Sequence, residues 1–142
     1  MKFKFNDGGR KDAGYKGTAG DCACRAIAIV TGQLYKDVYD TINIVSQTER
    51  ITKRKRSKSN ARLGVYKQLV RKYLLSLGWK WTPTMFIGQG CKVHLREEEL
   101  PKIGNILACV SKHYTAVING VLNDTFDCSR EGMRCVYGYY SK

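Results

Sequence analysis

The chain has 142 residues, enough for one domain with its own core, and 43% of them are hydrophobic. Its 25 Lys and Arg against 12 Asp and Glu give a net charge of +13, which favours polyanionic partners. No apolar stretch approaches the ~20 residues of a membrane span and no apolar leader begins the chain, so we expect a soluble, cytoplasmic protein without membrane partners.

A glycine-rich lead-in opens the chain, with a short strand predicted at Lys2–Phe5. An apolar helix follows, beginning at Cys22 and ending at Gly32. The first N–H groups of a helix lack partners and favour a thiolate, so Cys22 is the predicted nucleophile. Cys24 is the rival, but its side chain points about 200° away from that of Cys22, so only one of them can face a cleft.

Two further helices are predicted from apolar residues at helical spacing, one ending near Val45 and one over 65–77. Between them, residues 52–62 carry many positive charges and no hydrophobic anchor, which predicts an exposed loop. This loop is the candidate polyanion-binding site, although a solvated loop without a ligand explains the same pattern. Its candidate residues are Lys53, Arg54, Lys55, Arg56, Lys58 and Arg62.

The remaining pattern changes from helices to strands. A strand is predicted at 79–87, an extended piece at 91–95 and an acidic helical turn at 96–100. Strands then follow at 105–111, 113–118, 121–127 and 134–140, and Asn119-Gly120 is typical of a two-residue hairpin turn. The predicted fold class is α+β, a single domain over residues 1–142 in which N-terminal helices pack on a C-terminal antiparallel sheet.

The predicted hairpin brings a histidine and a carboxylate to one face of the sheet. If residue 118 pairs with residue 121, His113 lies opposite Phe126, and Asp124 lies diagonal to His113 on the same face. Thiol hydrolysis needs a thiolate, an imidazole that moves a proton and a group that orients the imidazole. Cys22, His113 and Asp124 are the predicted triad, with a surface carboxylate near a turn as the alternative role of Asp124.

Other residues are weaker candidates for these roles. Asn123 points to the other face of the hairpin, and Asp127 lies at the strand end. The second histidine, His94, sits between Lys92 and Arg96, a setting typical of an exposed side chain.

The six cysteines are expected to be reduced, because the chain shows no export signal and has a sufficient core. Cys22-Ala23-Cys24 and Cys91-Lys92-Val93-His94 can be read as metal-ligand pairs, with Cys128 and Cys135 as further ligands. The Cys-x-Cys spacing is tighter than structural zinc sites use, and no glycine loop for a nucleotide is present. The sequence therefore favours a protein without a metal or another cofactor, in which the cysteines other than Cys22 are buried or incidental thiols.

The segment Asp21-Cys22-Ala23-Cys24-Arg25-Ala26, followed by His113-Tyr114 and then Asp124, resembles the papain-like cysteine peptidase superfamily. This superfamily includes the bacteriocin-processing C39-like peptidases and the ovarian-tumour deubiquitinases, whose nucleophile helix is similar to the Cys-x-x-Arg-Ala segment. The whole chain also resembles small proteins of phages and prophages, which would place it in the host-cell cytoplasm. The resemblance implies hydrolysis of an amide, isopeptide or related acyl bond in a protein or peptide substrate.

One departure from the papain-like pattern concerns the oxyanion. These enzymes often place a glutamine before the cysteine, where this chain has Lys16 and Gly17. The oxyanion would then rely on the backbone N–H of Cys22, helped by Asp21, Thr18 or a nearby amide. Two hypotheses follow: a cysteine hydrolase, or a catalytically inactive basic module that binds nucleic acid or ribonucleoprotein on the same scaffold.

Overall fold

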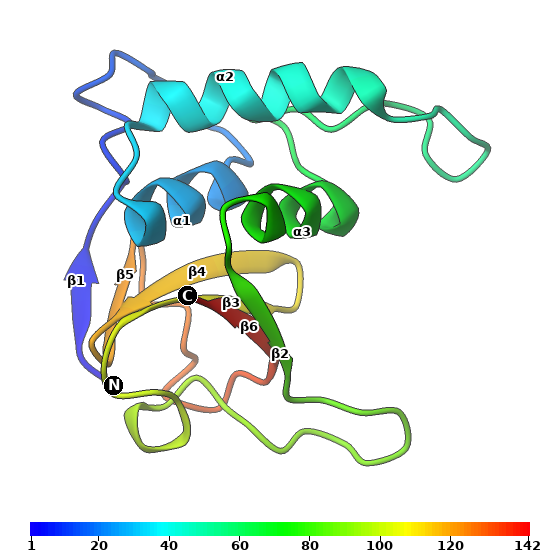
Figure 1. Cartoon of the computed structure of the whole chain (residues 1–142). Coiled ribbons are helices and arrows are strands. Elements are labelled where there is room, and N and C mark those ends of the chain that lie inside the picture. Colours follow the sequence, from blue (N-terminus) through cyan, green and yellow to red (C-terminus); the bar gives the residue numbers. More distant parts are fainter.

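One six-stranded sheet organises the fold, and three helices lie on one side of it (Figure 1). The computed structural model describes all residues from 1 to 142. The helices and strands in chain order are β1 (Phe3–Phe5), α1 (Cys22–Thr31), α2 (Tyr35–Val45), α3 (Lys67–Ser76), β2 (Lys80–Pro83), β3 (Asn105–Val110), β4 (His113–Ile118), β5 (Val121–Asp124) and β6 (Val136–Ser141). Short 3₁₀ turns cover Ser46–Thr48 and Glu97–Glu99. The predicted α+β class is confirmed.

The sheet is mixed, whereas the sequence predicted a purely antiparallel one. Its strand order is β1-β5-β4-β3-β6-β2, and β1 pairs in parallel with β5 while all the other pairs are antiparallel. The parallel pair joins opposite ends of the chain, Phe3 to Leu122 and Phe5 to Asp124. A pairing over this sequence separation leaves no local pattern, because only tertiary packing selects it.

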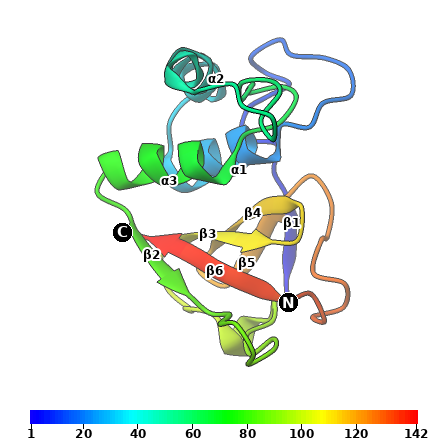
Figure 2. The same ribbon diagram turned by 90° about the vertical axis from the view of Figure 1, so that its right-hand side faces the viewer.

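The helices form two layers over the sheet. Figure 2 shows α1 and α3 next to the sheet and α2 farther out. A large core fills the space between helices and sheet and includes Ile27, Leu74 and Leu107. A smaller core, with Leu95 and Val117, lies among the strands and the long connections beyond them. Because both faces are covered, five of the six residues of β3 are buried in a continuous apolar run.

The turns around the candidate site follow the chemistry of their residues. Gly32 ends α1 in the left-handed conformation at φ 75°, where its N–H bonds to the carbonyl of Ala28. Asn119 and Gly120 both have positive φ, as the tight hairpin turn requires. The predicted register of this hairpin is confirmed, because Ile118 pairs with Val121.

No helix has the length and apolar character needed to cross a bilayer.

The expectation that all cysteines are reduced is wrong for one pair, since Cys91 and Cys135 form a disulfide. The predicted extended piece at 91–95 makes only isolated bridges, which pair Met85 with Cys91 and His94 with Cys135. The second bridge places Cys135 beside this segment, so that Cys91 and Cys135, 44 positions apart, are in contact. The other four cysteines are free, and all of them except Cys22 are buried.

Candidate functional site

The nucleophile candidate, Cys22, is the first residue of α1 and is half-buried. The side chain of His113 and the backbone N–H of Tyr114 lie close enough to the thiol to lower its pKa. Both residues open β4, against which α1 packs, so the helix start and the strand start meet. Cys24, the rival, faces the core: its side chain is fully buried, and burial raises the pKa of its thiol to about 12.

Asp124 holds the histidine from the other side. Its Oδ2 lies 2.7 Å from Nε2 of His113 and also accepts the hydroxyl of Thr115 at 2.7 Å. Its Oδ1 accepts the backbone N–H of Thr125 at 2.7 Å and lies 3.6 Å from the Arg25 guanidinium. The carboxylate is 3% exposed, so these contacts replace water and fix its position. Because Nε2 contacts Asp124, Nδ1 is the ring nitrogen left for the thiol.

The charges of the three groups depend on one another. Burial alone would raise the pKa of Cys22 above its usual value of 9.0, but the contacts with His113 and Tyr114 and the charge of Arg25 lower it below that value. Burial would lower the pKa of His113, but Asp124, Cys128 and Cys22 raise it to about 11. The pKa of Asp124 lies below its usual value, because the bonds from His113 and Thr115 outweigh burial. This pattern stabilises the thiolate of Cys22 and the imidazolium of His113 relative to their neutral forms.

A cavity of about 600 Å³ opens at the thiol and imidazole. Cys22 and His113 both line it, and three cationic residues, Lys67, Arg71 and Lys112, share the lining with no acidic residue. Aromatic side chains complete the wall, namely Trp81, Tyr114, Tyr137 and Tyr140. The cavity is therefore suited to a substrate with an acidic group and an apolar part.

The two side chains named for the oxyanion do not face this cavity. The carboxylate of Asp21 is 1% exposed and is bound by Arg10, Arg25 and the hydroxyl of Tyr35. Thr18 is exposed, and its carbonyl accepts a bond from Arg62 at 3.3 Å. The backbone N–H of Cys22, in the first turn of α1, remains as a donor.

Sequence reasoning missed a side-chain donor on the cavity wall. Gln68, near the start of α3, lines the same cavity as Cys22. Its Oε1 accepts a bond from Lys55 at 3.4 Å, which leaves the NH₂ group to donate. No pattern just before the cysteine indicates Gln68, because this residue comes from a later helix.

Thr115 and Arg25, which support Asp124, were also missed. For Thr115 the signal was present, because the hairpin register that brings His113 near Asp124 places Thr115 directly opposite that carboxylate. Arg25 carried a weaker signal, since it stands one helical turn after Asp21 and binds it as an i,i+4 pair.

The polyanion candidates divide into two groups. Lys55 lies over the ring of Tyr66, Lys58 donates to the carbonyl of Gln47, and Arg62 donates to the carbonyl of Lys16. In contrast, Lys53, Arg54 and Arg56 are exposed and make no ion pair or hydrogen bond through their side chains. The second group is the part of the loop that is free to meet a ligand.

Three potential metal ligands, on His113, Asp124 and Cys128, lie within 4.8 Å of one another. Their ligand atoms already serve the histidine–carboxylate contact, because Oδ2 of Asp124 is bonded to His113 and accepts the Cys128 thiol at 3.7 Å. A cation there would break that contact and would lie near the Arg25 guanidinium, so these residues fit proton transfer better than metal binding.

Comparison of the chain with protein-family models, with curated proteins and with solved structures found no match. The geometry, burial and charge of the residues themselves are therefore what indicates a function.

Proposed function

We propose that this chain is a papain-like cysteine hydrolase in which Cys22 is the nucleophile, His113 the proton carrier and Asp124 the orienting group. The observation that carries the proposal is the position of the His113 ring, which lines one cavity with the Cys22 thiol and contacts the buried Asp124 carboxylate, 2.7 Å away, with its Nε2. A base that activates a thiol needs the thiol within reach and a third group that orients the imidazole, and this arrangement provides for both.

The reaction follows from these contacts. The Cys22 thiolate attacks the carbonyl carbon, and the developing oxyanion accepts the backbone N–H of Cys22 and the amide of Gln68. The His113 imidazolium then donates its proton to the leaving group, which departs and leaves a thioester on Cys22. Neutral His113 takes a proton from water, whose hydroxide attacks the thioester, and the acid product leaves while the thiolate–imidazolium pair is restored.

The cavity suggests the substrate class. Lys67, Arg71 and Lys112 attract a negative group, and the aromatic wall suits an apolar side chain. An acidic peptide or an acyl compound with an anionic group meets both requirements, in keeping with hydrolysis of an amide, isopeptide or related acyl bond.

Thiol labelling tests the nucleophile directly. At about pH 6, iodoacetamide should modify Cys22 at least tenfold faster than an ordinary thiol, because the lowered pKa keeps more of it as thiolate. Cys22→Ala should abolish this labelling and His113→Ala should slow it, while Cys24→Ala, the matched control on the same helix, should leave it unchanged. Mass spectrometry locates the modified residue, and labelling of Cys22 that ignores His113→Ala would contradict the proposal.

We propose binding of nucleic acid or ribonucleoprotein as the second candidate function. It is favoured by the exposed, unpaired side chains of Lys53, Arg54 and Arg56 in a chain of net charge +13. The two functions differ in their dependence on Cys22, since a binding module keeps its affinity when the thiol is removed.

A further inference from the structure

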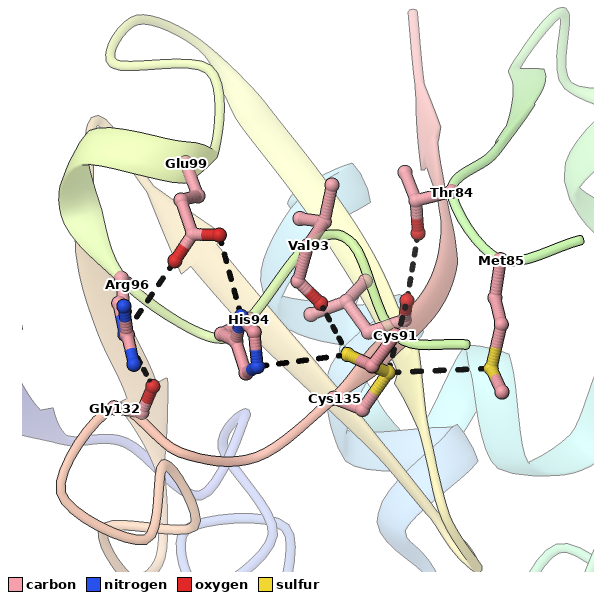
Figure 3. Close-up of a disulfide and its surroundings, with 10 residues drawn as sticks. Thr84, Met85, Cys91, Val93, His94, Arg96, Glu99, Gly132 and Cys135 are labelled. Atoms are coloured by element: carbon pink, nitrogen blue, oxygen red, sulfur yellow. Dashed lines mark hydrogen bonds and ion pairs between the residues drawn. A yellow bond between two sulfur atoms is a disulfide. The ribbon is translucent and has the colours of Figure 1, made fainter. Parts of the chain in front are cut away.

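Two sulfur atoms and an imidazole meet at a second place in the fold, between the segment after β2 and the start of β6. Figure 3 shows Cys91, Cys135 and His94 side by side, with Nε2 of His94 3.7 Å from Sγ of Cys91. The backbone sets this arrangement, because His94 pairs with Cys135 in an antiparallel bridge. Bonds from Leu95 to Arg134 and from Val136 to Val93, both 2.8 Å, flank the bridge.

The His94 ring is held in one orientation. Its Nδ1 lies 3.3 Å from Oε1 of Glu99, and Arg96 binds the other oxygen of that carboxylate at 3.4 Å. Arg96 is itself fixed by the carbonyl of Gly132 at 2.6 Å (Figure 3). A carboxylate behind Nδ1 is the usual partner of a metal-binding histidine, because it fixes the tautomer and directs Nε2 toward the metal.

We propose that the reduced form of this cluster binds one zinc ion through Sγ of Cys91, Sγ of Cys135 and Nε2 of His94. Two thiolates and one imidazole are a zinc ligand set that leaves the fourth tetrahedral position to water. The charge of Zn²⁺ is balanced by the two thiolates, so no uncompensated charge is created.

The distances suit this ligand set. With Zn–S of about 2.3 Å and Zn–N of about 2.0 Å, a tetrahedral site places sulfur and nitrogen about 3.6 Å apart. The Cys91–His94 separation of 3.7 Å already meets this requirement. The two sulfurs must move from bonding distance to about 3.8 Å, which side-chain rotation allows because the Cα atoms are 5.9 Å apart. The thioether of Met85 lies 3.9 Å from the Cys135 sulfur and is a weaker ligand than water.

The disulfide and the metal exclude each other at this cluster. A dithiol reductant gives its two hydrogens to the disulfide and becomes a disulfide itself, whereas a phosphine reductant takes oxygen from water, whose two hydrogens form the thiols, and becomes a phosphine oxide. Zinc binding then releases two protons as the thiols become thiolates. An oxidant that re-forms the disulfide takes two electrons from the thiolates and releases the metal. The cluster is therefore a metal site in its reduced state only.

Metal titration of the whole chain tests the proposal. After reduction with a phosphine and its removal, the protein should bind one zinc per chain, measured with a chromogenic chelator. Cobalt, used as a probe of the same site, should give the visible bands of a tetrahedral thiolate complex. The same protein with its disulfide intact should take up no metal at this site, a comparison that needs no substitution.

Variants locate the metal. Cys91→Ser and Cys135→Ser should abolish stoichiometric binding, and Glu99→Gln should weaken it about 10- to 100-fold by freeing the His94 ring. Cys22→Ser is the matched control, since it removes a free thiol outside the proposed zinc site and should leave one zinc per chain. If the reduced chain binds no zinc, or if Cys91→Ser binds it as the unaltered chain does, the proposal is wrong.

Discussion

Asp124 is the residue on which the charge state of the proposed site depends. The carboxylate is buried, yet its pKa is lowered, because it binds His113, Thr115 and the backbone of Thr125. In return, it raises the pKa of His113 against the effect of burial. A buried ion pair of this kind costs free energy to desolvate, so we infer that it serves the thiol beside it rather than stability alone.

Asp124→Asn removes the carboxylate charge while keeping the size of the side chain, so it should destabilise the charged forms of His113 and Cys22. Without the carboxylate, burial lowers the pKa of His113 from about 11, the imidazolium is lost, and the pKa of Cys22 rises toward that of an ordinary thiol. The pH midpoint of Cys22 labelling should therefore move upward, and hydrolysis should fall about 100- to 10,000-fold. Alkylation rates measured across pH check the shift.

The matched control is Asp127→Asn, which alters a neighbouring exposed carboxylate bonded to Ser129. It should leave the midpoint in place, and an equal shift in both variants would contradict the role of Asp124.

Linkage between proton binding and folding sets the pH range over which the unaltered His113–Asp124 pair stabilises the fold. The contribution of His113 is complete below pH 6.5 and is lost as pH rises through about 11, whereas that of Asp124 is lost as pH falls through its lowered pKa.

At the scale of elements, the start of α1 is fixed by a buried carboxylate rather than by a side-chain cap. Asp21 precedes the helix but makes no capping bond. Its carboxylate instead binds Arg10 of the lead-in at 3.1 Å, Arg25 of α1, and the hydroxyl of Tyr35 at 2.6 Å. Three segments therefore meet at one anion, directly before Cys22.

Asp21→Asn should loosen this junction, because two guanidinium groups would lose their common anion. Breaking a buried pair by removing one partner costs about 3 kcal/mol. The melting temperature should then fall by ~10 °C. Thermal unfolding checks the value, with Asp12→Asn as the matched control, because Asp12 is exposed and makes no ion pair. If both variants melt alike, Asp21 does not anchor the helix.

The elements show how far local sequence information reaches. The helix from Cys22 to Gly32 and the hairpin at Asn119-Gly120 are predictable because their caps, turns and periodicity lie within a few residues of one another. The register of that hairpin even predicts which face carries His113 and Asp124. The meeting of this face with Cys22 is different, since it depends on packing between α1 and β4, which local patterns do not encode.

The features that the sequence did not predict depend on residues far apart in the chain. The parallel pairing of β1 with β5 joins residues more than a hundred positions apart, and Gln68 reaches the cavity from a different helix than Cys22. The Cys91–Cys135 contact arises from two isolated bridges in irregular segments. The composition of the chain indicated free thiols, but composition does not indicate which two cysteines lie close together in the fold.

At the scale of the whole molecule, positive charge acts in two ways. The net charge of +13 attracts any polyanion over a long range, an effect that salt screens. Lys67, Arg71 and Lys112 contribute to this charge and, because they line the cavity, would also act at short range on an anion inside it. A specific nucleic-acid site would bind more tightly than the net charge alone explains. The loop with Lys53, Arg54 and Arg56 is where this additional affinity can be measured.

Replacing Lys53, Arg54 and Arg56 together by Gln lowers the net charge from +13 to +10. If these side chains contact phosphates, the slope of log affinity against log salt for duplex DNA should become shallower by about 3. The matched control replaces Lys11, Lys80 and Lys102, exposed cations outside the loop, and reaches the same net charge. Fluorescence anisotropy over a salt series compares the two variants. Equal losses of affinity in both variants would mean that the loop is a solvated surface, because the general charge would then explain the binding. Labelling of Cys22 should be the same in both variants in either case.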